Sequence, residues 1–256
     1  MADAEDGRYD RPLSQDADAR LSPEEVRVLW DFVHGDIMNG ATRTRLRENW
    51  GMCARHSWAY AVVEIELWEA GAGMRGGHQP FDLTILYADL LRTMVEKLGT
   101  GHAGRRGRTR ALERHGGCVI CADVRGETQG GVTHAGLDLR QLTLEANWMR
   151  FTREWLAETR PEWSASVCPD CAAAAGATVS PGTLPCRMHL LTSGVSSDAW
   201  WELTRTVLAE LAVEVRALTD SMTQSGLPAT AAENASWVKA VGWFTGWDFP
   251  LALSRS

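Results

Sequence analysis

The chain has 256 residues, of which 45% are hydrophobic and 23% charged, so it has the composition of an ordinary globular protein that can bury a substantial core. Its formal net charge of -7 argues against broad, non-specific binding to nucleic acid. The opening MADAEDGRYD lacks the basic and apolar regions of an export signal, and no run reaches the ~18 apolar residues of a membrane span, so we expect a cytoplasmic protein without a membrane segment.

A first helix is predicted to follow a polar, flexible leader at residues 1–21. Ser22 is suited to cap the helix, Pro23 to its first position, and Glu25 to complete a capping box with Ser22. Gly40 is expected to end or bend this helix. Its apolar stripe is Val26, Leu29, Trp30, Val33 and Ile37.

Two more helices are predicted before residue 100. One begins at 53–56 and ends in the glycine-rich turn at 71–77, and the other spans 81–98 with Gly99 as its stop. Residues 100–117 then place five arginines among glycines, which indicates an exposed linker. We therefore expect an N-terminal helical region at 22–99 and a zinc-binding helical region at 118–250.

The second region is also predicted to be helical. Residues 126–136 are polar and turn-rich and suit a short hairpin or a loop, and a helix is expected over 142–159, ended by Pro161. A long helix should start at Ser197 and Asp198, and a last helix should follow the capping box of Thr230 and Glu233. The expected stripe of the long helix is Trp200, Leu203, Val207, Leu208, Leu211, Val215, Leu218 and Met222.

Strand signals are few. The sequence thus predicts a mainly α protein, a helical bundle with zinc-tied loops at helix ends and few short strands. The long helix is equally suited to packing within one chain and to packing against a second copy in a homo-oligomer.

Every cysteine of the chain belongs to a pair with metal-ligand spacing. Two donors three positions apart lie on one side of a tight turn, where both can reach one ion at about 2.0–2.3 Å. Two pairs complete a Cys3His tetrahedron, so we predict one or two Zn2+ ions per chain. Disulfides and a redox dithiol are the alternatives. The eight candidate ligands are Cys53, His56, Cys118, Cys121, Cys168, Cys171, Cys186 and His189.

The spacing leaves open which two of these four pairs bind the same ion. Only a short Ala-, Gly- and Pro-containing loop separates Cys168 and Cys171 from Cys186 and His189, which favours a shared ion. By elimination, Cys53 and His56 would then join Cys118 and Cys121. A swapped arrangement of Cys118 and Cys121 with Cys186 and His189 is also compatible with the spacing.

Three short segments together resemble a family of bacterial, largely actinobacterial, zinc-binding proteins of unknown function. They are GMCARHSW at 51–58, LYADLL at 86–91 and the tryptophan helix from Ser236 to Gly246. The resemblance implies zinc and a helical fold, and it implies no reaction. Members often begin with a C-P-x-C pair, whereas this chain has RPLS at 11–14. Without that pair, the resemblance implies that the ligands at 53 and 56 borrow those at 118 and 121, or form a weaker site.

The preferred functional hypothesis is a non-catalytic accessory or regulatory protein. Zinc closed by four protein ligands leaves no position for water, and the twelve tryptophans suit core packing or the walls of a pocket for a small aromatic ligand or a protein partner. The second hypothesis is an enzyme of specialised metabolism that uses a Trp-lined pocket, or an open zinc site at 53 and 56.

A metal-independent version of the enzyme would use acid–base residues. Candidates are His34 with Asp36, or the carboxylates Glu64, Glu66 and Glu69. Helical spacing points neighbouring carboxylates in different directions, which argues against a catalytic pair. The third hypothesis is nucleic-acid binding through the arginine run at 105–114, although the segment after Cys186–His189 lacks the basic helix of a zinc finger.

Overall fold

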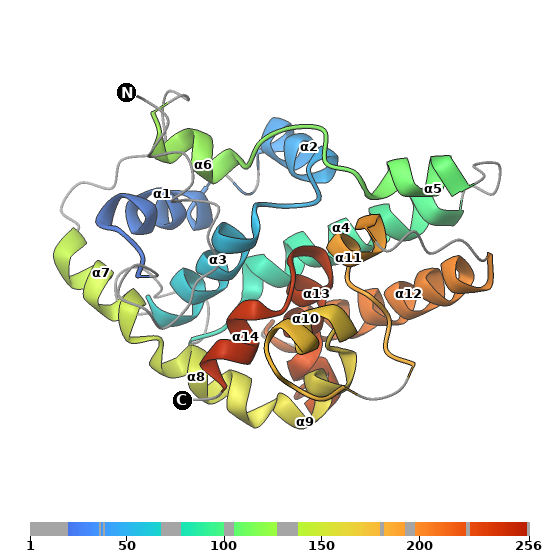
Figure 1. Cartoon of the computed structure of the whole chain (residues 1–256). Helices are drawn as coiled ribbons and strands as arrows, with labels where there is room; N and C mark the ends of the chain where they lie inside the picture. The colour runs from blue at the N-terminus through green and yellow to red at the C-terminus, as the bar shows by residue number, and fades with distance from the viewer. Residues whose placement is uncertain are drawn as a thin grey trace.

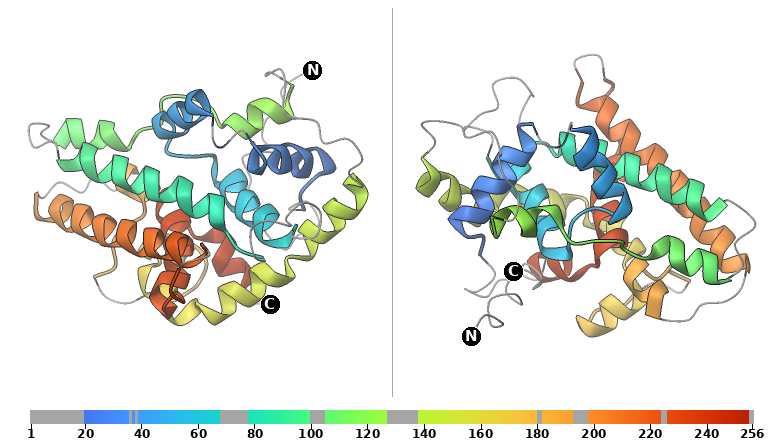
Figure 2. Two further views of the ribbon diagram at one scale, coloured as in Figure 1. Left: turned by 180° about the vertical axis from the view of Figure 1, so that it is seen from behind. Right: turned by 90° about the horizontal axis from the view of Figure 1, so that it is seen from above.

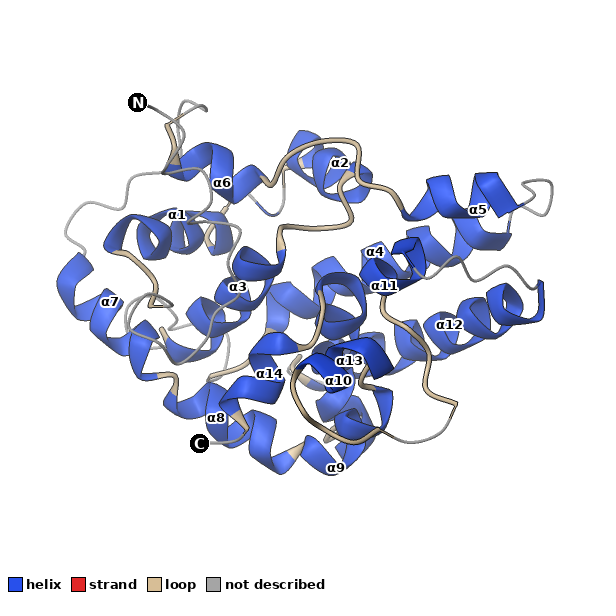
Figure 3. Cartoon of the chain, in the orientation of Figure 1, coloured by secondary structure: helices blue, strands red, loops and turns tan. Residues whose placement is uncertain are grey.

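The computed structural model describes residues 20–35, 37, 39–67, 78–99, 105–126, 138–179, 182–192, 198–223 and 226–254. Within these ranges all regular structure is helical, which confirms the mainly α class, and no strand occurs (Figure 3). The segment best suited to a hairpin, 126–136, lies almost wholly outside them.

The helices are named in chain order in Figure 1. They are α1 (Pro23–Val33), α2 (Gly40–Glu48), α3 (Ala54–Glu66), α4 (Phe81–Gly99), α5 (Arg105–Leu112), α6 (Val119–Val124), α7 (Leu139–Trp148), α8 (Arg150–Glu158), α9 (Arg160–Trp163), a 3-10 turn η3 (Ser164–Ser166), α10 (Pro169–Ala174), α11 (Arg187–Thr192), α12 (Asp198–Ser221), α13 (Ala231–Thr245) and α14 (Asp248–Leu253).

Side-chain caps explain where several helices begin. The predicted capping boxes are confirmed at α1, through Ser22 and Glu25, and at α13, through Thr230 and Glu233. We expected Gly40 to end or bend the first helix, but it is instead the first residue of α2. The reason is that the side chain of Asn39 accepts two backbone N–H groups, so the chain starts a new helix there.

Helix α3 is the centre of the molecule. Nearly all its residues are buried, so it is surrounded by packing partners on all sides. Its two C-terminal carboxylates then anchor other helices. Glu64 accepts the backbone N–H groups of Asp82 and Leu83 at the start of α4, and Glu66 accepts those of Arg150 and Thr152 at the start of α8. The two carboxylates face different helices, as their spacing predicts.

The helix expected over 142–159 is broken at Met149. This residue adopts left-handed backbone angles, with φ of 50° and ψ of 34°, between α7 and α8. The break has a physical cause, because the buried Glu66 carboxylate takes N–H groups that an uninterrupted helix would have bonded internally. Pro161 likewise does not end the helical structure but lies in the first turn of α9.

Helix α12 lies alongside α4 in both side views (Figures 1 and 2). Its buried stripe differs from the predicted one: Leu203 and Val207 are 47% and 38% exposed, whereas Thr204 is fully buried. Thr204 can be buried because its hydroxyl donates to the Trp200 carbonyl at 2.8 Å. The buried residues are spaced alternately three and four positions apart along the helix. They are Trp201, Thr204, Leu208, Leu211, Val215 and Leu218.

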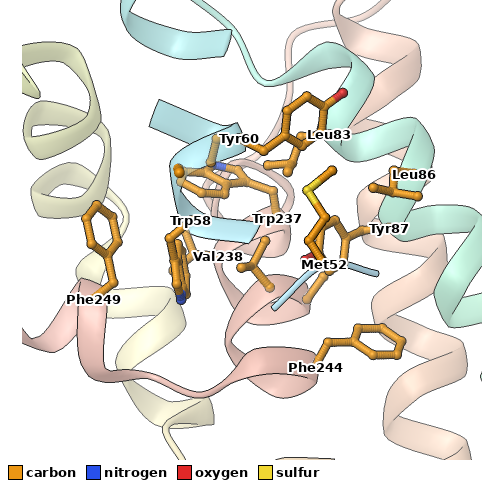
Figure 4. Packing of buried hydrophobic residues seen from close by; sticks show 14 of the residues in the cluster. Met52, Trp58, Tyr60, Leu83, Leu86, Tyr87, Trp237, Val238, Phe244 and Phe249 are labelled. Atoms are coloured by element: carbon orange, nitrogen blue, oxygen red, sulfur yellow. The ribbon is translucent and has the colours of Figure 1, made fainter. Parts of the chain in front are cut away.

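The two predicted regions share one hydrophobic core. Buried residues from Leu21 to Leu253 form a single cluster, part of which is drawn in Figure 4. The segment predicted as an exposed linker contains α5, which packs on α4 and α11 and buries Leu112. The sequence did not indicate this helix, because Leu112 is one apolar residue among arginines and glycines, too few to form a visible stripe.

Tryptophans supply much of this core. Trp58 stacks on Phe249 with ring centroids 5.2 Å apart, and its indole N–H donates to the Gly246 carbonyl. Trp247 approaches α13 so closely that a β-carbon at Gly242 would lie 2.7 Å from its ring. Trp148, by contrast, is 67% exposed. None of the described helices combines the length and the apolar character needed to cross a bilayer.

Candidate metal centres

Two clusters of cysteine and histidine side chains lie in the described part of the chain. Centre 1 consists of Cys53, His56, Cys118 and Cys121, and centre 2 of Cys168, Cys171, Cys186 and His189. In each centre the four potential ligand atoms lie within 4.8 Å of one another. This is the grouping that the loop length favoured, and the swapped arrangement does not occur. All eight candidate ligands are therefore brought together in two sets of four.

The distances in centre 1 match a tetrahedron around one ion. The His56 Nδ1 atom lies 3.4 Å from the Cys53 sulfur, 3.6 Å from that of Cys118 and 3.3 Å from that of Cys121. The Cys53 and Cys121 sulfurs are 3.9 Å apart. A tetrahedral zinc ion would separate two sulfurs by about 3.8 Å and a sulfur from a nitrogen by about 3.5 Å. A disulfide would need about 2.05 Å.

The ligands of centre 1 lie at the N-termini of two helices. Cys53 is the N-cap residue of α3, so His56 lies in the first turn with its N–H directed at the Cys53 sulfur. Cys118 is the N-cap residue of α6, and Cys121 follows one turn later. The preceding Gly51 has a φ of 89°, a conformation that favours glycine, and a β-carbon there would lie 3.3 Å from Leu90. The chain thus turns tightly into the site.

Centre 2 repeats this geometry. The His189 Nδ1 atom lies 3.2, 3.5 and 3.3 Å from the sulfurs of Cys168, Cys171 and Cys186, and the last two sulfurs are 3.9 Å apart. Cys168 is the N-cap residue of α10, with Pro169 at its first position. Convergence of three thiols and an imidazole on one point favours metal over a redox dithiol.

Electrostatics within the clusters also favours a cation. In centre 1, hydrogen bonds with the thiols of Cys118 and Cys121, followed by burial, raise the pKa of Cys53. In centre 2, hydrogen bonds with Cys168 and Cys186 raise the pKa of Cys171 in the same way. A thiol that donates a hydrogen bond to a neighbouring thiolate keeps its proton, and burial adds to the cost of a further negative charge. A divalent ion would offset that cost and allow three thiolates to coexist.

Glu25 is a functional residue that the sequence analysis recognised only as a helix cap. Its carboxylate is buried and lies 3.3 Å from the His56 Nε2 atom, on the side of the ring away from the thiols. It also pairs with Arg55, at 2.6 Å from the guanidinium Nε. Burial alone would raise the pKa of Glu25, but the hydrogen bonds from His56 and Arg55 hold it well below the usual range. A carboxylate on the outer ring nitrogen orients a metal-binding histidine.

Arg187 performs a different task beside centre 2. It is fully buried, and its guanidinium donates to the carbonyls of Phe244 and Leu112 at 3.0 and 2.7 Å. Burial, with the nearby charge of Arg114, lowers the pKa of Arg187 to about 10. This arginine therefore ties α11, and with it Cys186 and His189, to α13 and the end of α5. No sequence pattern distinguished it from a surface arginine.

The acid–base candidates that the structure describes each hold a helix end. His34 caps the end of α1 through a 2.8 Å contact between its ring Nδ1 and the Trp30 carbonyl. Glu64 and Glu66 bind the starts of α4 and α8, and Asp36 and Glu69 lie outside the described residues.

The arginine run is partly engaged within the protein. Arg108 forms an ion pair with Asp198 at the start of α12. The side chains of residues 105 and 106 are not among those that the structure describes. Among the described side chains of this run, Arg108 is therefore already paired within the protein, which leaves fewer guanidinium groups free to contact phosphates.

No protein-family model, curated protein or solved structure matches this chain.

Proposed function

We propose that this chain is a non-catalytic zinc-binding protein in which centres 1 and 2 are structural and the helical frame holds a small ligand or a protein partner. The observation that carries the proposal is the closed donor set. In each centre one histidine Nδ1 lies 3.2–3.6 Å from three thiol sulfurs. Four protein ligands leave no coordination position for the water or substrate of a catalytic zinc ion.

The donor chemistry supports zinc. Calcium and magnesium take oxygen ligands, whereas thiolates with one imidazole in a tetrahedron suit zinc. Zinc would also contribute directly to folding, because each ion would connect two separate helices. Centre 1 links α3 to α6, and centre 2 links α10 to α11.

An open zinc site at centre 1 is the less well supported alternative. It would require one ligand to leave, but His56 is fully buried and is held from behind by Glu25. The metal-independent alternative loses support too, because Glu64 and Glu66 are occupied with helix N-termini.

The remaining proposals follow from the same residues. A reducing compartment such as the cytoplasm suits clusters of three reduced thiols. Membership of the actinobacterial zinc-binding family rests on the three motifs, of which the first carries two ligands of centre 1. Nucleic-acid binding gains little support from an arginine run that pairs internally at Arg108.

Cobalt substitution tests whether the sites are closed. Tetrahedral Co2+ absorbs visible light much more strongly than five- or six-coordinate Co2+, and thiolate ligands add charge-transfer bands. We expect a tetrahedral spectrum from both centres that does not change when azide is added, because azide finds no open position. A weak six-coordinate spectrum, or one that shifts with azide, would contradict the proposal.

A further inference from the structure

A pocket of about 270 Å³ lies between α12, α13 and the segments that lead into centre 2. The exposed side of α12 forms one wall, which accounts for Leu203 and Val207, the two apolar residues that the predicted stripe had placed in the core. At about 30 Å³ per water, the pocket has room for roughly nine waters, or for a small organic molecule with one or two rings.

Two indoles form the deeper wall. Trp243 and Trp247 both line the pocket and are 6% and 1% exposed. Each contacts a second ring that is not part of the pocket lining. Trp243 meets Phe244 edge to face at 4.9 Å, and Trp247 stacks on Trp163 at 6.2 Å. These walls are therefore held in place, and their apolar indole surface suits an aromatic or apolar ring.

Three charged side chains line the same pocket, and the sum of their charges is negative. Lys239 is paired with Glu214 at 2.7 Å, so its charge is already compensated. For the Glu210 carboxylate the described residues provide no ion pair, and this side chain is exposed. Two carboxylates against one ammonium leave a net charge of about -1, which favours a cation over an anion.

The pocket also borders the segments that carry centre 2. Thr183 and Leu184 line it directly before Cys186, and Ser166 lines it shortly before Cys168. Both chain segments that lead to the ligands of centre 2 therefore contribute to the wall of the pocket. Metal binding would hold this wall in place.

We propose that this pocket binds a small molecule with an aromatic or apolar ring and a protonated amine. The ring would lie against Trp243, Trp247 and the apolar side of α12, and the amine would pair with Glu210 at the rim. The inference deepens the proposed non-catalytic binding function and rests on it.

Isothermal titration of the full-length, metal-loaded protein with three related probes tests the inference. Tryptamine, indole and indole-3-acetate share a ring and differ in the charge of the side chain. We expect tryptamine to bind about two- to fivefold more tightly than indole, the size of effect that a solvent-exposed ion pair gives, and indole-3-acetate to bind most weakly. Absence of tryptamine binding at millimolar concentration, or equal binding of the acetate, would overturn the inference.

Variants connect the binding to this pocket. Glu210→Gln should weaken tryptamine binding about two- to fivefold and leave indole binding unchanged, because only the exposed charged contact is lost. Glu202→Gln is the matched control, since Glu202 lies on the same helix but pairs with Arg205 outside the pocket. Val207→Trp should fill the pocket and abolish binding of all three probes. If Glu210→Gln and Glu202→Gln behaved alike, the assignment of the amine would fail.

Zinc content and thermal unfolding of each variant separate this inference from the proposed function. Val207 is partly exposed, so the tryptophan variant should keep its zinc and its unfolding temperature. Loss of probe binding with zinc retained would concern the pocket alone. Probe binding by a wild-type protein that contained no metal would contradict the structural-zinc proposal and leave the pocket intact.

Discussion

Replacement of Cys121 by serine should leave most of the protein without its native fold. Cys121 is buried in centre 1, and a serine hydroxyl does not provide the thiolate that a zinc ion needs. Structural zinc contributes about 10–16 kcal/mol in zinc-finger peptides, which is comparable with the ~5–15 kcal/mol net stability of a whole domain. Because Cys53 and His56 lie at the start of the central helix α3, their release should loosen the core. Circular dichroism against temperature measures this loss.

The neighbouring Ala122→Ser variant is the control. It introduces the same hydroxyl at a half-buried position one residue away that donates no ligand atom. We expect it to retain both zinc and the cooperative unfolding transition. A Cys121→Ser protein with the zinc content and melting temperature of the wild type would contradict the structural role of centre 1.

Replacement of Glu25 by glutamine should have the second-largest effect. It leaves the guanidinium of Arg55 buried without its charged partner, which costs about 3–5 kcal/mol for a buried ion pair. It also weakens the contact that orients His56, and loss of such outer partners lowers metal affinity about 10–100-fold. Urea unfolding measures the first effect, and competition for zinc with a chromophoric chelator measures the second.

Glu24→Gln provides a matched control one position away. The Glu24 side chain is 47% exposed and pairs with Arg27 at the surface, where an ion pair contributes about 0–1 kcal/mol. We therefore expect a nearly wild-type free energy of unfolding and unchanged zinc affinity. Equal effects of the two substitutions would show that Glu25 acts only as a helix cap.

Features encoded by residues close in sequence could be predicted here. The capping boxes at Ser22 and Thr230 are complete within four residues, so the starts of α1 and α13 followed directly. The Cys-x-x-Cys and Cys-x-x-His steps are equally local. The loop length even favoured the grouping of ligands into two centres that the structure contains.

Features that depend on contacts between distant residues could not be predicted. Glu25 and His56 are separated by 31 positions, and nothing in either segment indicates that they meet. The break at Met149 depends on Glu66, which is far away in the chain. Helix α12 is rotated relative to its predicted stripe because a satisfied hydroxyl let Thr204 enter the core. The pocket follows from that rotation, which leaves Leu203 and Val207 facing it.

The most direct test of the central claim is the zinc content of the untagged protein, measured by elemental analysis together with the number of thiols that react under native conditions. Two closed Cys3His centres predict two zinc ions per chain and six unreactive thiols, all of which become reactive after denaturation with a chelator. A protein that is folded, free of metal and reactive at its cysteines would contradict the account.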